Sequence, residues 1–171
     1  MAHAVTLALD GTPVPRHGRT MPVETIQRLY QALNEHDGDT AAACYTDDAV
    51  FRDPAFGRLT GGAVKDMWRM LCQRSHDLQV VLIDSGAEGA DGWARWSASY
   101  TFSDTGRSVV NVIRSRFRFR GDLIAEQVDT FSLRRWGGQA LGRRATLMGT
   151  TPLLGYAVRR KARRQLADYR R

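Results

Sequence analysis

Residues 45–62, Tyr-Thr-Asp-Asp-Ala-Val-Phe-Arg-Asp-Pro-Ala-Phe-Gly-Arg-Leu-Thr-Gly-Gly, are the stretch that decides the fold of this chain. They place the carboxylate of Asp53 before Pro54 and between two aromatic residues, Phe51 and Phe56. An apolar environment disfavours the charged form of a carboxylate and raises its pKa toward the range useful for proton transfer. The alternative is that Asp53 only caps the turn before Pro54, since Asp-Pro commonly opens a turn.

The composition is that of one globular domain. A chain of 171 residues, 43% hydrophobic and 25% charged, is long enough to bury a core without disulfides. Cys44 and Cys72 lack metal-ligand spacing, so we expect two buried thiols. The histidines form no cluster and no phosphate-binding or dinucleotide motif occurs, so we predict neither a metal site nor a cofactor. The N-terminal run is too short for a signal peptide and no stretch is long enough to span a membrane, which predicts a cytoplasmic protein.

The net charge of +7 is concentrated near the end of the chain. Arginines are dense from Arg134 onward, where the only acid is Asp168, and the rest of the chain taken alone is mildly acidic. A charge confined to one terminal segment argues against a general nucleic-acid-binding surface. We therefore expect no nucleic-acid partner.

Helices are expected first and strands after them. Residues 1–21 have no apolar period and are expected to be a flexible lead-in. Apolar residues then recur at helical spacing, and four alternating runs separated by turn sequences follow in the second half. The expected helices cover residues 22–36, 40–45 and 63–74, and the expected strands cover residues 49–52, 78–84, 92–103, 107–120 and 123–133.

The long strands alternate between apolar and polar side chains. In residues 107–120, Ile113 and Phe117 alternate with Arg114 and Arg116. A strand with one solvated face requires this alternation, and the alternative is that the arginines form an anion-binding strip. We expect the three helices to pack on the apolar face of a curved antiparallel sheet, which is an α+β fold.

Residues 137–171 form a basic C-terminal extension of a different kind. Residues 137–152 are turn-prone, and from residue 153 onward apolar residues fall close to one stripe of a helix whose other positions are arginines and Lys161. Such a helix packs its stripe over the domain or a second subunit, or binds an anionic membrane surface or a partner groove through residues 153–171. Packing is the preferred alternative.

The motif from Tyr45 to Pro54 with the following Gly61, together with the order of helices and strands, resembles the nuclear-transport-factor-2-like superfamily. Its members include ketosteroid isomerases and SnoaL-like polyketide cyclases. The resemblance covers roughly residues 22–136 and implies a cone-shaped, cystatin-like α+β domain. It also implies a small apolar, carbonyl-bearing ligand such as a sterol or polyketide, and a homodimer formed through the sheet.

The resemblance assigns roles to particular residues. In the ketosteroid isomerases the aspartate before the proline is the general base, and Asp53 matches it. Their helical oxyanion-hole tyrosine falls at Leu29, about 100° around the helix from Tyr30, and their strand aspartate falls at Ser115. The cyclases use an acid late in the sheet, for which Asp129 is the candidate, with a surface acid paired to a strand arginine as the alternative. The Asp-Arg-Asp arrangement of the epoxide hydrolases has no counterpart on the expected strand.

These positions predict an isomerase or cyclase that works by proton transfer without a cofactor. The alternative is a non-catalytic ligand-binding or dimer-forming module whose C-terminal helix binds a partner. An Asp53 carboxylate exposed to solvent or held in a salt bridge would exclude the enzyme. The predicted catalytic residues are Asp53, Asp129 and Tyr30, and the predicted ligand-binding residues are Phe51, Phe56, Trp68, Trp96, Tyr100, Asn111, Ser115 and Phe131.

Overall fold

The computed structural model describes residues 22–142 and 152–171, so the predicted lead-in and most of the predicted turn-prone segment lie outside it. The helices are α1 (Pro22–Asn34), α2 (Gly38–Ala43), α3 (Gly62–Arg74), α4 (Leu133–Leu141) and α6 (Pro152–Tyr169). The strands are β1 (Tyr45–Asp53), β2 (Gly57–Thr60), β3 (Gln79–Glu88), β4 (Asp91–Phe102), β5 (Arg107–Arg120) and β6 (Leu123–Thr130).

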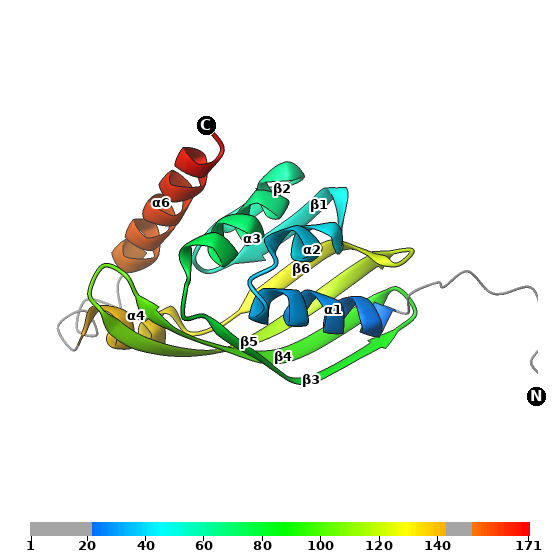
Figure 1. Cartoon of the computed structure of the whole chain (residues 1–171), viewed down its shortest axis with the longest axis horizontal. Coiled ribbons are helices and arrows are strands. Elements are labelled where there is room, and N and C mark those ends of the chain that lie inside the picture. Colours follow the sequence, from blue (N-terminus) through cyan, green and yellow to red (C-terminus); the bar gives the residue numbers. More distant parts are fainter. Residues whose placement is uncertain (1–21, 143–151) are drawn as a thin grey trace, which may run out of the picture.

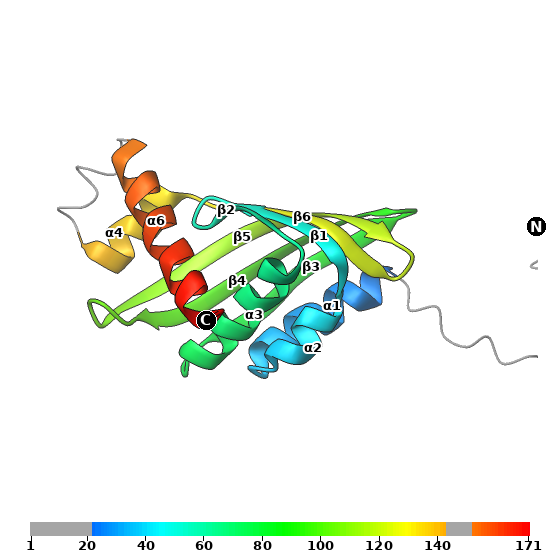
Figure 2. The same ribbon diagram turned by 90° about the horizontal axis from the view of Figure 1, so that it is seen from above.

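The six strands form one curved sheet in the order β2-β1-β6-β5-β4-β3. The neighbouring strands are antiparallel except β1 and β6, which run parallel. Helices α1, α2 and α3 cover one face of the sheet, and α6 lies beside α3 over the same face (Figures 1 and 2). The expected α+β fold is therefore confirmed.

The helical layer is buried through apolar residues at helical spacing. In α1 these include Ile26, Leu29 and Leu33, and in α3 they include Val64 and Met67. Together with the inner face of the sheet they form one continuous core. Both predicted thiols are free and buried. The apolar residues whose spacing predicted the helices thus form the helical side of the core.

Helix α2 begins earlier than expected because of its cap. The side chain of Asp37 accepts a hydrogen bond from the backbone N–H of Thr40 at 2.9 Å. This satisfies a helix N-terminal donor, so the helix covers Gly38–Ala43 instead of residues 40–45. Tyr45 then belongs to β1, which is longer than the predicted strand at residues 49–52.

Two short elements were not expected from the sequence. Strand β2 is antiparallel to β1, with Val50 opposite Thr60 and Asp53 opposite Gly57. The turn that joins the two strands ends at Gly57, whose φ is 73°. Helix α4 begins at Leu133, which was predicted to end the last strand, and continues into the segment predicted to be turn-prone. There the Gln139 side chain bonds both the N–H and the carbonyl of Val110. Tertiary hydrogen bonds, which local sequence does not show, stabilise this helix.

The outer face of the sheet is solvated, as the alternation predicted. Burial alternates along β5 from Val109 onward, and Arg118 and Arg120 pair with Asp91 and Asp48. The same region also exposes large apolar side chains on three adjacent strands. These are Val81, Ile83, Trp93, Val110 and Val112.

The C-terminal helix α6 packs against the domain. Leu166 is only 4% exposed, and Ala162 and Tyr169 contact the same core. This confirms the packing alternative for these residues, while binding of α6 to a membrane surface stays a prediction. Among the described residues, no helix is both long and apolar enough to cross a membrane.

Candidate active site

A cavity of about 270 Å³ lies between the inner face of the sheet, α3 and α6. Its wall is mainly aromatic and aliphatic, and two aspartates, Asp53 and Asp129, contribute to it. The structure therefore brings together nine of the residues predicted from the sequence. Besides the two aspartates, these are Phe51, Phe56, Trp68, Trp96, Tyr100, Asn111 and Phe131.

Asp53 ends β1 and both caps a turn and lines the cavity. Its Oδ1 accepts a hydrogen bond from the backbone N–H of Phe56 at 2.5 Å, so Asp53 caps the turn, and the same side chain lines the cavity. Burial raises the pKa of Asp53 to about 6, although backbone N–H groups of Phe56, Gly57 and Ala55 and the charge of Arg159 oppose the rise. No salt bridge among the described residues involves this carboxylate.

Asp129 lies near the end of β6 and is only 5% exposed, which excludes the alternative of a surface acid. Its Oδ1 accepts hydrogen bonds from Ser115 Oγ at 2.6 Å and from Gln127 Nε2 at 2.8 Å. Burial raises the pKa of Asp129 to about 7 despite these two donors, and the negative charge of Asp53 adds to the rise. At neutral pH this group is therefore protonated in a large fraction of molecules.

The pairing of β1 with β6 brings the two carboxyl groups together. The strands are parallel, with Phe51 opposite Gln127 and Arg52 opposite Val128. Asp53 and Asp129 follow one position further along the two strands, on the face that carries Phe51 and Gln127. The two acids thus lie on neighbouring strands in the cavity wall, and the charge of Asp53 contributes to the raised pKa of Asp129.

A chain of hydroxyl groups supports Asp129 from one side. Ser115 Oγ receives a hydrogen bond from Trp96 Nε1 at 2.9 Å and lies 2.8 Å from the Tyr30 hydroxyl. Because the single hydroxyl proton of Ser115 is donated to Asp129, the Tyr30 hydroxyl is the donor to Ser115. Burial holds the pKa of Tyr30 well above its ordinary value, so this donor stays protonated.

A second chain reaches Asp129 through Gln127. The Tyr45 hydroxyl donates to Gln127 Oε1, which orients the amide so that its Nε2 donates to Asp129. Neither residue was predicted as part of the site. The sequence could have indicated Gln127, because it lies two positions before Asp129 and so on the same face of the strand. Nothing in the sequence indicated Tyr45, because its contact with Gln127 is made between two strands that are far apart in the chain.

Tyr30 and Ser115 have a different place from the one predicted. Both are buried, but neither lines the cavity, and their contact with it runs through Asp129. The adjacent helix position, Leu29, is also buried in the core. The sequence missed further wall residues that contribute polar groups. These are Arg74, Ser75, Thr101, Ser103 and Gln165.

The described residues contain no group of three or more His, Cys, Asp or Glu side chains that could hold a metal ion. One buried donor has no partner there: the indole N–H of Trp68, a residue of the cavity wall. The chemistry that the described residues offer is therefore that of two carboxyl groups of raised pKa, several neutral donors and the guanidinium of Arg74 around a largely apolar space.

A family model for the SnoaL-like domain matches residues 26–127. Among curated proteins, no sequence matches this chain significantly. The fold is similar to that of a ketosteroid isomerase-like protein from Catenulispora acidiphila DSM 44928, crystallised with trimethylamine, with a TM-score of 0.63 and 14% identity over 71% of this chain and 95% of that one.

Two further solved structures are similar. A candidate polyketide cyclase from Xanthomonas campestris gives a TM-score of 0.61 at 21% identity, covering 70% of this chain and 96% of that one. An LEH-like epoxide hydrolase from M. tuberculosis gives 0.60 at 20% identity, covering 76% and 96%. At these identities the likeness shows the fold alone.

The raised pKa of Asp129 predicts a pH-dependent loss of stability. The folded chain holds this proton up to a pH of about 7, whereas an aspartate of the unfolded chain, with its ordinary pKa of 3.8, releases it at a much lower pH. The bound proton stabilises the folded chain fully at pH values below the unfolded pKa. This stabilisation is lost as the pH rises through the folded pKa, and the free energy of unfolding falls by up to about 4 kcal/mol in total. Asp129→Asn should therefore lose less stability than the unmodified protein between pH 5 and pH 8 in urea titrations.

The matched control is Asp47→Asn, which changes an exposed aspartate of the same sheet. Its stability difference between the two pH values should follow the unmodified protein. An identical pH dependence for Asp129→Asn and the unmodified protein would contradict the assignment of a raised pKa to Asp129.

Proposed function

Because the chain belongs to the SnoaL-like domain family, we propose that its cavity binds a small apolar ligand with a carbonyl group and that Asp53 transfers a proton on that ligand. The observation that carries the proposal is a partly buried carboxyl group, Asp53, and a buried one, Asp129, both of raised pKa, in the wall of a largely apolar cavity. Enolisation needs only a base and oriented donors, which fits this inventory.

The lining favours a ring-containing ligand of modest size. Trp68, Trp96 and Phe131 offer flat apolar surfaces, and the volume of about 270 Å³ is near the lower end of small-molecule pockets. Asn111 adds a neutral amide to the wall contributed by β5. A sterol-like or polyketide-like molecule, with one polar carbonyl on an apolar frame, suits such a surface.

Asp53 is the base in this proposal. With a pKa of about 6 it is largely ionised at neutral pH, yet it is more basic than an ordinary aspartate. Its carboxylate takes a proton from the carbon next to the ligand carbonyl. The electrons of the broken C–H bond form the enolate, whose negative charge lies on the former carbonyl oxygen. If the ligand has a β,γ-double bond, return of the proton to the γ-carbon moves that double bond and completes an isomerisation, whereas return to the same carbon gives exchange.

Asp129 supplies the opposing donor. Both of its hydrogen bonds end on Oδ1, so we infer that the protonated oxygen is Oδ2 and that it donates to the developing enolate. Asn111 is a second donor in the wall. Tyr30 and Ser115 act behind Asp129 by keeping Oδ1 as an acceptor. An ionised Asp53 and a neutral Asp129 coexist between pH values of about 6 and about 7.

The proposal predicts proton exchange that depends on Asp53. The probe is 2-tetralone, a bicyclic ketone with acidic hydrogens next to its carbonyl, incubated in D2O and followed by ¹H NMR. The protein should accelerate loss of the α-proton signal, and Asp53→Asn should reduce the catalysed rate by at least about 100-fold, the usual contribution of a general base. Asp47→Asn, an exposed change on the same strand, should leave the rate unaltered.

Two results would contradict the proposal. Exchange that survives in Asp53→Asn at the unmodified rate would remove Asp53 as the base. Binding of 2-tetralone, seen by ligand line broadening, without any catalysed exchange would favour the non-catalytic ligand-binding module.

We also propose that the protein is a homodimer formed through the outer face of the sheet. Five large apolar side chains are exposed on β3, β4 and β5, which is unusual for a surface that only faces water. A second copy offers the same patch, so a two-fold pairing covers both patches at once. The resemblance to a superfamily that pairs through its sheets supports this choice of partner.

The dimer proposal predicts that a charge in the patch separates the subunits. Val112→Glu places a carboxylate at an exposed, apolar position of β5 and should shift the mass measured by light scattering from two chains to one. Gln73→Glu, which adds a charge to an exposed position of α3, should not change the mass. A monomeric unmodified protein at 100 μM, or a Val112→Glu dimer, would contradict the proposal.

A further inference from the structure

Helix α6 lies beyond the residues that the family model matches, yet it forms part of the cavity wall. Gln165 lines the cavity, and the next residue, Leu166, is buried in the core beside it. A helix that only covered the surface would not need to place an amide side chain at a ligand cavity. Gln165 is thus a candidate contact for whatever the cavity holds.

Two arginines of α6 bind the turn that follows Asp53. Arg159 Nε donates to the carbonyl of Pro54 at 3.2 Å, and Arg163 Nε donates to the carbonyl of Phe56 at 2.8 Å. The Nη2 of Arg163 also reaches the carbonyl of Arg58 at 3.4 Å. The turn is the one whose N–H groups bond the Asp53 carboxylate. The arginines therefore donate hydrogen bonds to carbonyl groups of the turn, while the Asp53 carboxylate accepts hydrogen bonds from N–H groups of the same turn.

Gly57 gives the turn room for this contact. Its φ of 73° is a conformation that other residues rarely adopt, and a Cβ there would lie 3.1 Å from Arg163 Nη2. The guanidinium thus packs against a position that has no side chain. The absence of a side chain at Gly57 therefore allows the turn and α6 to pack closely.

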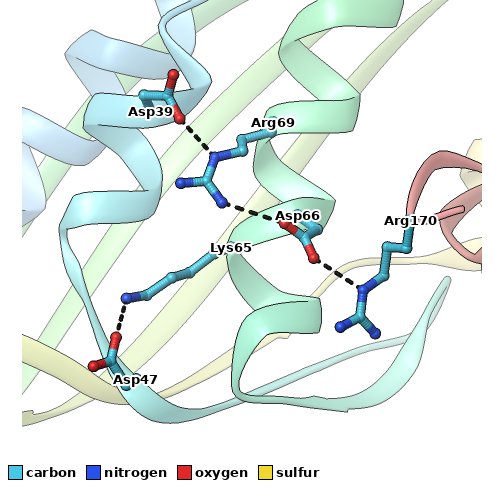
Figure 3. A network of polar contacts seen from close by, with 6 residues as sticks. All are labelled: Asp39, Asp47, Lys65, Asp66, Arg69 and Arg170. Carbon is cyan, nitrogen blue, oxygen red and sulfur yellow. Dashed lines mark hydrogen bonds and ion pairs between the residues drawn. The ribbon is translucent and has the colours of Figure 1, made fainter.

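Ion pairs attach the middle and the C-terminal end of α6 to different parts of the domain. Near its C-terminal end, Arg170 Nε pairs with Asp66 of α3 at 2.9 Å, and Asp66 pairs with Arg69 at 3.2 Å, which pairs with Asp39 of α2 at 2.6 Å (Figure 3). In the middle of the helix, Lys161 pairs with Asp104. Each exposed pair adds little alone, but together they fix where α6 lies over the cavity.

We propose that α6 is a working part of the active site, in which Gln165 contacts the ligand and Arg159 and Arg163 position Asp53. The kind of ligand rests on the proposed function, whereas the effect on Asp53 does not. Asp53 faces Asp129 of β6 and the charge of Arg159 of α6. Arg159 favours the ionised form of Asp53, which partly offsets the effect of burial.

The ligand contact is tested with 2-naphthol, a fluorescent bicyclic phenol, titrated into the full chain. Gln165→Trp should fill the cavity and weaken binding by at least about tenfold. Gln165→Met has a similar volume, removes only the amide, and should weaken binding by a smaller factor. Gln73→Trp and Gln73→Met, at an exposed position of α3, should bind as the unmodified protein does.

The positioning role is tested without turnover or ligand, by ¹³C NMR titration of the Asp53 carboxyl group. Arg159→Ala should raise the titration midpoint above that of the unmodified protein, since a stabilising positive charge is lost. Arg160→Ala removes the same charge from the neighbouring exposed position and should leave the midpoint nearly unchanged. Arg163→Ala should broaden or shift the Asp53 signal, whereas Arg164→Ala should not.

Each part has a result that overturns it. Unchanged 2-naphthol affinity in Gln165→Met and in Gln165→Trp would exclude the ligand contact, and if Gln165→Trp does not fold, Gln165→Met decides alone. Equal midpoints for Arg159→Ala and Arg160→Ala, with an unaltered signal in Arg163→Ala, would reduce α6 to a surface helix. Failure of the unmodified protein to bind both 2-naphthol and the ketone 2-tetralone would contradict the proposed ligand class, and the titration would then decide whether α6 positions Asp53.

Discussion

The parallel pairing of β1 with β6 is the constraint on which the site depends. Antiparallel neighbours build the rest of the sheet, but only this pair places the last residue of one strand, Asp53, beside the penultimate residue of another, Asp129. The same register puts Phe51 and Gln127 side by side on the inner face. A shift of β1 by one residue against β6 would turn Asp53 to the outer face of the sheet and separate it from Asp129.

Burying two acids at one point costs stability, and the surrounding structure is arranged to limit that cost. Hydroxyl and amide donors converge on Asp129 from Ser115 and Gln127, and backbone N–H groups bond Asp53. The donors lower the two pKa values less than burial raises them, so both remain high. Such a balance is typical of functional sites, where stability is exchanged for reactivity.

The sequence predicted the fold and most of the cavity wall because both follow from periodicity. Alternation along β5 and helical spacing in α1 and α3 identify inward-facing residues without tertiary information. Predictions failed where contacts between distant segments decide the structure. The hydrogen bonds of Gln139 to Val110 make a helix of a glycine-containing segment, and Ser115 supports Asp129 instead of facing the cavity. The role of Gln165 in the cavity wall was not predicted, because the rest of that wall comes from segments far away in the sequence.

The proposed chemistry requires that Asp53, which is partly buried, and Asp129, which is buried, both have a raised pKa, and that the charge of Asp53 contributes to the rise at Asp129. The most direct measurement is a ¹³C NMR titration of the aspartate carboxyl groups in the unmodified protein and in Asp53→Asn. We expect two midpoints well above the others, near pH 6 and pH 7, and a lower Asp129 midpoint once the charge of Asp53 is removed. Midpoints near 4 for both groups, or an Asp129 midpoint that does not respond to Asp53→Asn, would contradict it.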